Sequence, residues 1–151
     1  CTNLVNYGSF EGIKVFLNQE NPLPNDPPDI WYSRPTNIAT VNLNNELFGI
    51  NNLKIDSTGM VYQNLSIETG KSYKIAGWDK TPSDSVGYIS LSSIDCPNFK
   101  VFTDRTSTNN AWIYINKTFF NTCSSNSAEI RLEAIIDTPS VYFDNIQLFE
   151  V

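Results

Sequence analysis

The sequence contains no histidine, and this absence excludes several kinds of catalytic and metal site. A Ser-His-Asp triad or a Cys-His pair needs an imidazole as its general base, so neither can form here. Zinc and iron sites with histidine ligands are excluded for the same reason. The three cysteines, Cys1, Cys96 and Cys123, are too few and too widely spaced for a thiolate metal cluster.

Cysteine is scarce, and two of the three cysteines lie in turn-like segments: Cys96 in IDCPN and Cys123 in NTCSSNS. A disulfide between them is compatible with a protein outside the cytosol. Cys1 is then left over, and three interpretations of it stay open. It is the lipidated first residue of a bacterial lipoprotein, a disulfide partner for another chain, or simply the point at which the piece was cut from a longer chain. Because the chain begins with cysteine rather than methionine, we expect a processed or excised product from which any signal peptide has been removed.

The chain also lacks long apolar runs and basic runs. No stretch approaches 18 apolar residues, so we expect no membrane insertion. The net charge is −6, and without a basic cluster to neutralise phosphates we expect no nucleic-acid partner. Charged residues make up only 17% of the chain, whereas asparagine occurs 19 times. A surface of neutral amides suits neutral polar ligands, although coding bias in the source organism would give the same composition.

Short apolar runs separated by Gly, Pro, Asn, Asp and Ser indicate strands throughout. No window of a dozen residues shows helical periodicity, and the pattern is typical of an all-β sandwich. Strands are predicted at residues 3–7, 13–17, 38–43, 48–56, 60–67, 72–79, 87–94, 99–103, 111–119, 129–136 and 140–149. They leave no room for a second domain, so we expect one domain over residues 1–151. The proline-rich loop 18–29 must run over the surface, because proline cannot donate to a strand ladder.

Alternation along the predicted strands assigns side chains to faces. The aliphatic members are expected in the core: Ile75, Ile89, Leu91, Ile113, Ile115, Ile130 and Leu132. The opposite faces carry aromatic and hydrogen-bonding groups that meet water or a ligand: Trp78, Tyr88, Trp112, Tyr114, Arg131 and Glu133. Gln63 falls on a core side, so its amide is expected to be hydrogen-bonded, to backbone at a strand end.

Several stretches, in order along nearly the whole chain, resemble the jelly-roll carbohydrate-binding modules that accompany xylanases and glucanases. The stretches are NLVNYGSFEG, the later Trp31, GMVYQNLSIETGKSYKIAGWDK, AWIYINKTF and EIRLEAI with VYFDNIQLFEV. The segment SSIDCPNFKVFTDRTSTNN has no counterpart in that pattern. The resemblance implies a β-sandwich jelly roll of two antiparallel sheets.

The resemblance also implies a structural calcium ion near the first and last strands. A carboxylate against a sheet core has to be neutralised or find a cation, and calcium takes six to eight oxygens, many from backbone carbonyls. Glu11 and Asp144 are then the side-chain ligands, and Ser9 and a residue near 51–54 supply carbonyls. The other reading leaves both acids at strand edges, solvated or paired with Lys54 or Lys14.

The family binds polysaccharide in a cleft on the outer face of one sheet, and the outward residues have the composition that this needs. A flat tryptophan or tyrosine ring stacks on the apolar C–H face of a sugar, and the flanking hydroxyls need polar partners. The resemblance therefore makes Trp78, Tyr88, Trp112, Tyr114, Arg131 and Glu133 the predicted ligand-binding set. Packing beneath a loop is the alternative for the tryptophans, and Trp31 with Tyr32 is a second predicted platform.

Three functions compete at this level. The first is a non-catalytic module that binds a poly- or oligosaccharide, secreted or at a cell surface and part of a larger multidomain protein. The second is a structural or adhesion jelly roll of a cell-surface or virion protein without a sugar site. An enzyme is the third, but no pair of acids lies in a recognisable glycosidase motif. The sequons at Asn64 and Asn116 would carry glycans only in a eukaryotic secreted or virion protein.

Overall fold

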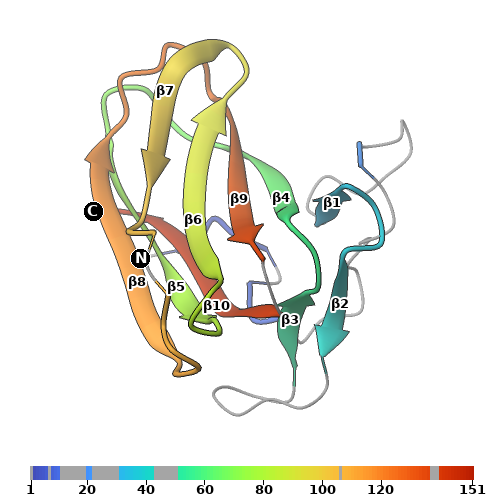
Figure 1. Cartoon of the computed structure of the whole chain (residues 1–151). Helices are drawn as coiled ribbons and strands as arrows, with labels where there is room; N and C mark the ends of the chain where they lie inside the picture. Colours follow the sequence, from blue (N-terminus) through green and yellow to red (C-terminus); the bar gives the residue numbers. More distant parts are fainter. Residues whose placement is uncertain are drawn as a thin grey trace.

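The chain folds into two layers of antiparallel β-sheet, as predicted (Figure 1). The computed structural model describes residues 2–6, 8–10, 20–21, 31–42, 51–105, 107–136 and 140–151. Within these residues there is no helix, and therefore none that could cross a membrane. The strands are β1 Tyr32–Arg34, β2 Ala39–Asn42, β3 Asn52–Ile55, β4 Gly59–Ser66, β5 Ser72–Lys80, β6 Val86–Ser93, β7 Cys96–Phe102, β8 Ile113–Phe120, β9 Ser127–Ile135 and β10 Val141–Glu150.

Among the described residues each sheet has five strands, and neighbours in a sheet are mostly distant in sequence. One sheet has the order β1-β4-β9-β6-β7, and the other has the order β2-β3-β10-β5-β8. The chain therefore passes repeatedly from one layer to the other. Strands β9 and β10, late in the chain, occupy the middle of the two sheets.

The core lies between the sheets and is built from one face of each strand. Ile75, Ile89, Leu91, Ile130 and Leu132 are fully buried, which confirms their predicted inward orientation. Strand β8 differs, because it lies at the edge of its sheet in the part of the chain that the structure describes. Ile113 is 44% exposed and Ile115 is half-buried. The prediction that these two belong to the buried core was wrong for Ile113.

Strand boundaries depart from the prediction near the start of the chain. Residues 3–6 form no strand, and the predicted strand 13–17 lies outside the described residues. Strand β1 was not predicted, because three residues are too short for alternation to be visible. Strands β2 to β10 each overlap a predicted one.

The N-terminal segment is nevertheless fastened to both sheets. Leu4 N donates to Leu148 O at 2.7 Å, and Ile146 N donates to Gly8 O at 2.9 Å. On the other sheet, the buried amide of Gln63 exchanges two hydrogen bonds of 2.9 Å with the backbone of Asn6. This confirms the expected backbone partner of Gln63. Its amide donates to and accepts from the backbone of Asn6, as a neighbouring strand would.

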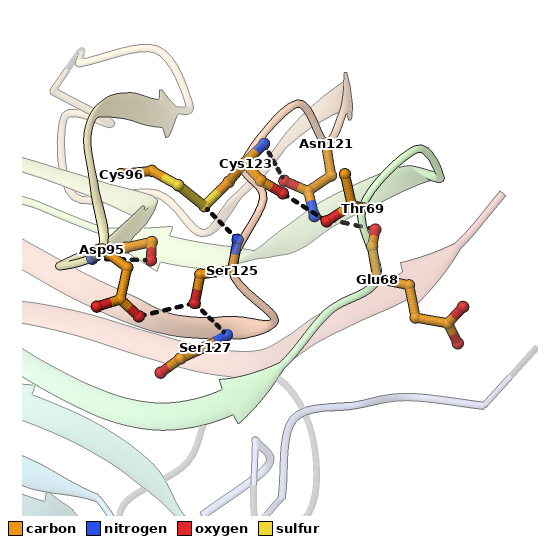
Figure 2. The surroundings of a disulfide bond; sticks show 9 residues. Glu68, Thr69, Asp95, Cys96, Asn121, Cys123, Ser125 and Ser127 are labelled. Carbon is orange, nitrogen blue, oxygen red and sulfur yellow. Dashed lines mark hydrogen bonds between the residues drawn. A yellow bond between two sulfur atoms is a disulfide. The ribbon is translucent and has the colours of Figure 1, made fainter.

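A disulfide joins Cys96 to Cys123, which confirms that pairing. Cys96 begins edge strand β7 of one sheet, and Cys123 follows edge strand β8 of the other. Figure 2 shows the hydrogen bonds around it: Thr69 Oγ1 donates to Cys123 O at 2.6 Å, and Ser125 Oγ donates to Asp95 Oδ2 at 2.7 Å. The disulfide therefore joins the two sheets at one edge of the sandwich, and hydrogen bonds between neighbouring loops surround it.

Candidate functional site

Five of the six predicted ligand-binding residues lie on two opposite faces of the sandwich. Tyr88, Arg131 and Glu133 alternate with buried core residues of β6 and β9, so they lie on the outer face of the β1-β4-β9-β6-β7 sheet. Trp78 and Tyr114 lie by the same reasoning on the outer face of the other sheet, where they are register partners. Trp112 precedes β8. One ligand cannot contact both groups, because the core separates them.

The first surface, here called the Arg131 face, is the outer face of the sheet around Tyr62, Tyr88, Arg131 and Glu133. Strand pairing places Tyr88 opposite Glu133 and Tyr62 opposite Arg131. These side chains therefore come from three adjacent strands, β4, β9 and β6.

Hydrogen bonds hold the charged groups of the Arg131 face in place. Ser90 Oγ donates to Glu133 Oε2 at 2.5 Å. Arg131 Nε donates to Glu129 Oε1 at 2.7 Å, and Arg34 Nη1 donates to the same oxygen at 3.2 Å. The carboxylate of Glu129 is thus shared by two guanidinium groups, each partly exposed, and all three side chains are pre-oriented.

Aromatic rings underlie this charged layer. Tyr32 and Tyr62 stack with centroids 5.4 Å apart, both buried, and Arg34 Cζ lies 3.9 Å from the Tyr62 ring centroid. The Tyr62 hydroxyl donates to Glu20 O at 2.5 Å. Burial raises the pKa of the hydroxyls of Tyr62 and Tyr88, so both are neutral donors at physiological pH.

Sequence reasoning missed part of this face. Tyr62 precedes Gln63, which alternation placed on a core side, so the same pattern turns Tyr62 outward and could have added it to the predicted set. Arg34 lies on the unpredicted strand β1, and Tyr32 beside it was assigned to a platform with Trp31. That platform is wrong, because Trp31 is fully buried against Phe10, with ring centroids 5.6 Å apart.

The second surface, here called the Trp78 face, carries Trp78, Tyr114 and Lys74. The two rings are 5.5 Å apart and inclined at 53°, and Lys74 Nζ lies 5.8 Å from the Tyr114 centroid. Tyr114 is 40% exposed, whereas Trp112 is half-buried and its indole N–H has no hydrogen-bond partner among the described residues. The inclined rings do not form the flat platform that stacks best on a sugar.

The predicted calcium ligands can be followed only in part, because Glu11 lies outside the described residues. Asp144 is fully buried, and its Oδ1 accepts a hydrogen bond from Asn145 N at 2.7 Å. Full burial in a central strand excludes the reading of Asp144 as a solvated edge acid. Lys54, the alternative partner, forms its ion pair with Asp56 at 3.6 Å.

The N-terminal segment runs beside the irregular part of β10 that follows Asp144. The strand is irregular between Asp144 and Gln147, and residue 145 has a left-handed φ of 49°. Half-buried Ser9 follows Gly8, whose carbonyl bonds Ile146. A carboxylate with backbone carbonyls is the oxygen donor set that calcium prefers, although no group of three or more His, Cys, Asp or Glu side chains that could hold a metal occurs in the described ranges.

A second buried carboxylate, Asp79, was not singled out from the sequence. It is fully buried on the inner face of β5, and neither of its oxygens has a hydrogen-bond partner among the described residues. Burial raises its pKa from 3.8 to about 8. Gly87 faces it so closely that a Cβ at that position would lie 3.2 Å from Asp79 Oδ2.

Comparison with known proteins gives a fold but no relative in sequence. No protein-family model matches the chain, and no curated protein matches it either. Among solved structures it is similar to TmCBM61 in complex with beta-1,4-galactotriose, with a TM-score of 0.68 and 14% identity over 100% of both chains. It is also similar to a CBM4 structure, with a TM-score of 0.64 and 16% identity over 97% of this chain and 99% of that one.

One similar structure is part of a much larger protein. The enzymatically active domain of bacteriophage CBA120 tailspike protein 4 matches with a TM-score of 0.68 and 15% identity, over 99% of this chain but only 21% of the tailspike chain. At these identities the likeness shows the fold alone. The chain has the jelly-roll fold of carbohydrate-binding modules, as its sequence motifs led us to expect.

Proposed function

We propose that this chain is a non-catalytic carbohydrate-binding module that holds a poly- or oligosaccharide on the Arg131 face. The observation that carries the proposal is the composition of that face. The solvent side of a sandwich sheet normally carries scattered polar groups, but here hydrogen-bonded arginine, glutamate and serine side chains overlie tyrosine rings. Because these side chains are already held in place, a ligand that binds them costs little conformational entropy.

The chemistry of the face matches that of a sugar. Each sugar hydroxyl both donates and accepts a hydrogen bond, so it needs carboxylate acceptors and guanidinium donors side by side, as Glu133 and Arg131 provide. Phe102, 43% exposed at the edge of the same sheet, offers ring surface for the C–H face of a sugar. The fold supports the proposal, because the similar structures include one module in complex with beta-1,4-galactotriose and one xylan-binding domain.

The acids of the Arg131 face argue against hydrolysis. Glu129 and Glu133 are four residues apart on one strand, which separates their Cα atoms by roughly 13 Å. Glycosidases hold their two carboxyl groups about 5–10 Å apart across the scissile bond. Glu129 is also held by two arginines, which suits a ligand-positioning role. The module would then be part of a larger extracellular or cell-surface protein.

The test is polysaccharide binding by variants of the two faces. Glu133→Gln keeps the shape of the side chain but removes its charge, and a lost charged hydrogen bond weakens binding about 10-fold or more. Trp78→Ala, on the opposite face, is the control and should leave affinity unchanged. Affinity electrophoresis followed by titration calorimetry on the bound glycan would measure both. Loss of binding with Trp78→Ala alone would move the site to the Trp78 face.

Calcium is the proposed structural cofactor, with Asp144, Glu11 and the Ser9 carbonyl as ligands. At a concentration 100 times its dissociation constant, an ion that binds only the folded state stabilises it by about 2.7 kcal/mol. For a chain of this size we therefore expect calcium to raise the melting temperature by roughly 5–10 °C over a chelator. Asp144→Asn should abolish the difference, whereas the exposed Asp104→Asn should retain it. An equal shift in both variants would place the ion elsewhere.

A structural or adhesion role is the second candidate function. Its specific support is the tailspike likeness, in which the matching part makes up 21% of the chain of a bacteriophage tailspike domain. A chain that binds no saccharide but still melts higher with calcium would favour this role over the first.

A further inference from the structure

The loop after β7 brings an arginine onto the Arg131 face. The guanidinium carbon of Arg105 lies 4.6 Å from the ring centroid of Tyr88 and 4.5 Å from that of Phe102. Phe102 pairs with Ser90, so the arginine lies beside the Ser90–Glu133 hydrogen bond. Arg105 therefore joins the proposed binding surface from outside the sheet.

Hydrogen bonds fix the loop on both sides of Arg105. Thr103 N donates to Ile89 O at 2.9 Å, and Ile89 N donates to Thr103 Oγ1 at 3.0 Å. Three residues after Arg105, Thr108 and Thr81 exchange two reciprocal bonds of 2.7 Å between backbone N–H and side-chain hydroxyl. All these threonines are buried. The backbone that carries Arg105 is therefore held in position before any ligand arrives.

Arg105 also differs from the other cations of the face in its partners. Arg34 and Arg131 share Glu129, and Lys100 Nζ lies 3.8 Å from Glu133. Arg105 is exposed, and in the part of the chain that the structure describes it has ring contacts but no carboxylate partner.

Among the ion pairs that the described residues form on this face, two carboxylates, Glu129 and Glu133, serve three cations, Arg34, Arg131 and Lys100. Arg105 is a fourth cation and takes part in none of these pairs. A neutral sugar gives no reason for a cation placed over rings in this way, whereas an anionic ligand would pair with it.

We infer that the saccharide bound by the Arg131 face is a uronic-acid polysaccharide, with its carboxylate on Arg105 and its ring against Phe102. This inference rests on the proposed function and names its ligand class. The guanidinium is exposed, so its N–H donors are open to a ligand, and a planar carboxylate can accept two of them. In a uronic acid the carboxylate is bonded directly to the pyranose ring. The ring can therefore reach exposed Phe102 while the acid reaches Arg105.

The experiment compares polygalacturonate, a sulfated polysaccharide and neutral galactan and xylan, with the full chain and two charge-matched variants. Arg105→Ala removes the unpaired guanidinium, and Lys74→Ala removes a cation that lies near an aromatic ring on the Trp78 face. We expect polygalacturonate to bind at least 10-fold more tightly than the neutral polymers in low salt. Arg105→Ala should weaken that binding at least 10-fold and reduce its salt dependence, and Lys74→Ala should change neither.

Each other outcome overturns a different statement. Equal binding of neutral and acidic polymers, unchanged or strengthened in Arg105→Ala, overturns the inference and leaves the proposed function standing. Binding of the sulfated polymer alone overturns the choice of a carboxylate. Failure of every polysaccharide to bind, from a folded protein, overturns the proposed function itself.

Discussion

Replacing Asp79 by asparagine is expected to raise the free energy of unfolding at pH 9 by several kcal/mol. The carboxyl is fully buried in the sandwich, and burial raises its pKa from 3.8 to about 8. Ionising such a group in the folded state costs on the order of 5 kcal/mol relative to the unfolded chain. Asparagine has nearly the same shape and no charge, so it removes this cost.

The sign of the pH dependence follows from the direction of the pKa change. The folded state keeps the Asp79 proton to about pH 8, whereas the unfolded chain releases it near 3.8. The folded state binds more protons between these values, so this group lowers stability progressively as pH rises from about 4 to 8. Below pH 4 the parent chain and Asp79→Asn should have similar free energies of unfolding.

Urea unfolding of Asp79→Asn, Asp104→Asn and the parent chain at pH 4, 7 and 9 would measure the effect. Exposed Asp104 is the matched control, and its substitution should leave the profile of the parent unchanged. If Asp79→Asn loses stability at pH 9, then the carboxylate is ionised and satisfied in the folded protein, and our account of it is wrong.

Removing the disulfide is expected to cost about 3.5 kcal/mol of stability. Cys96 and Cys123 are 27 residues apart, and cross-linking a loop of that length restricts the unfolded chain by about this amount. The hydrogen bonds of Thr69 and Ser125 beside the disulfide do not depend on the S–S bond, so the fold should survive without it. The double variant Cys96→Ser/Cys123→Ser should therefore unfold at lower urea concentration.

Cys1→Ser is the control for loss of a thiol, and it should leave the urea midpoint unchanged. Urea unfolding of the parent chain with and without reductant would measure the same loss of stability without any substitution. A double variant as stable as the parent would mean that the two cysteines are not joined in the protein.

Local alternation predicted what depends on one strand at a time. It placed Ile89 and Ile130 in the core, turned Tyr88 and Arg131 outward, and identified Gln63 as a buried amide. Each of these assignments needs only the period of two along a strand. Asp79 shares the parity of buried Ile75 and could have been found in the same way.

Other features depend on which strands are neighbours, and no single strand carries that information. Trp78 and Tyr88 both point outward, but the order of strands places them on opposite faces. The positions of Arg34 and Arg105 on the Arg131 face depend on a three-residue strand and on a loop held by distant threonines. Such contacts are set by tertiary packing, which the sequence motifs do not describe.

The central position of β10 has a consequence for synthesis. Strands β3 and β5 both pair with β10 and not with each other, and Leu4 bonds Leu148 at the other end of the chain. A nascent chain that still lacks β10 therefore has no middle to that sheet and no partner for the backbone of Leu4. Folds dominated by such distant pairings form in milliseconds to seconds. Folding of this domain should thus follow release of β10 from the ribosome, and earlier strands with unpaired edges would depend on chaperones until then.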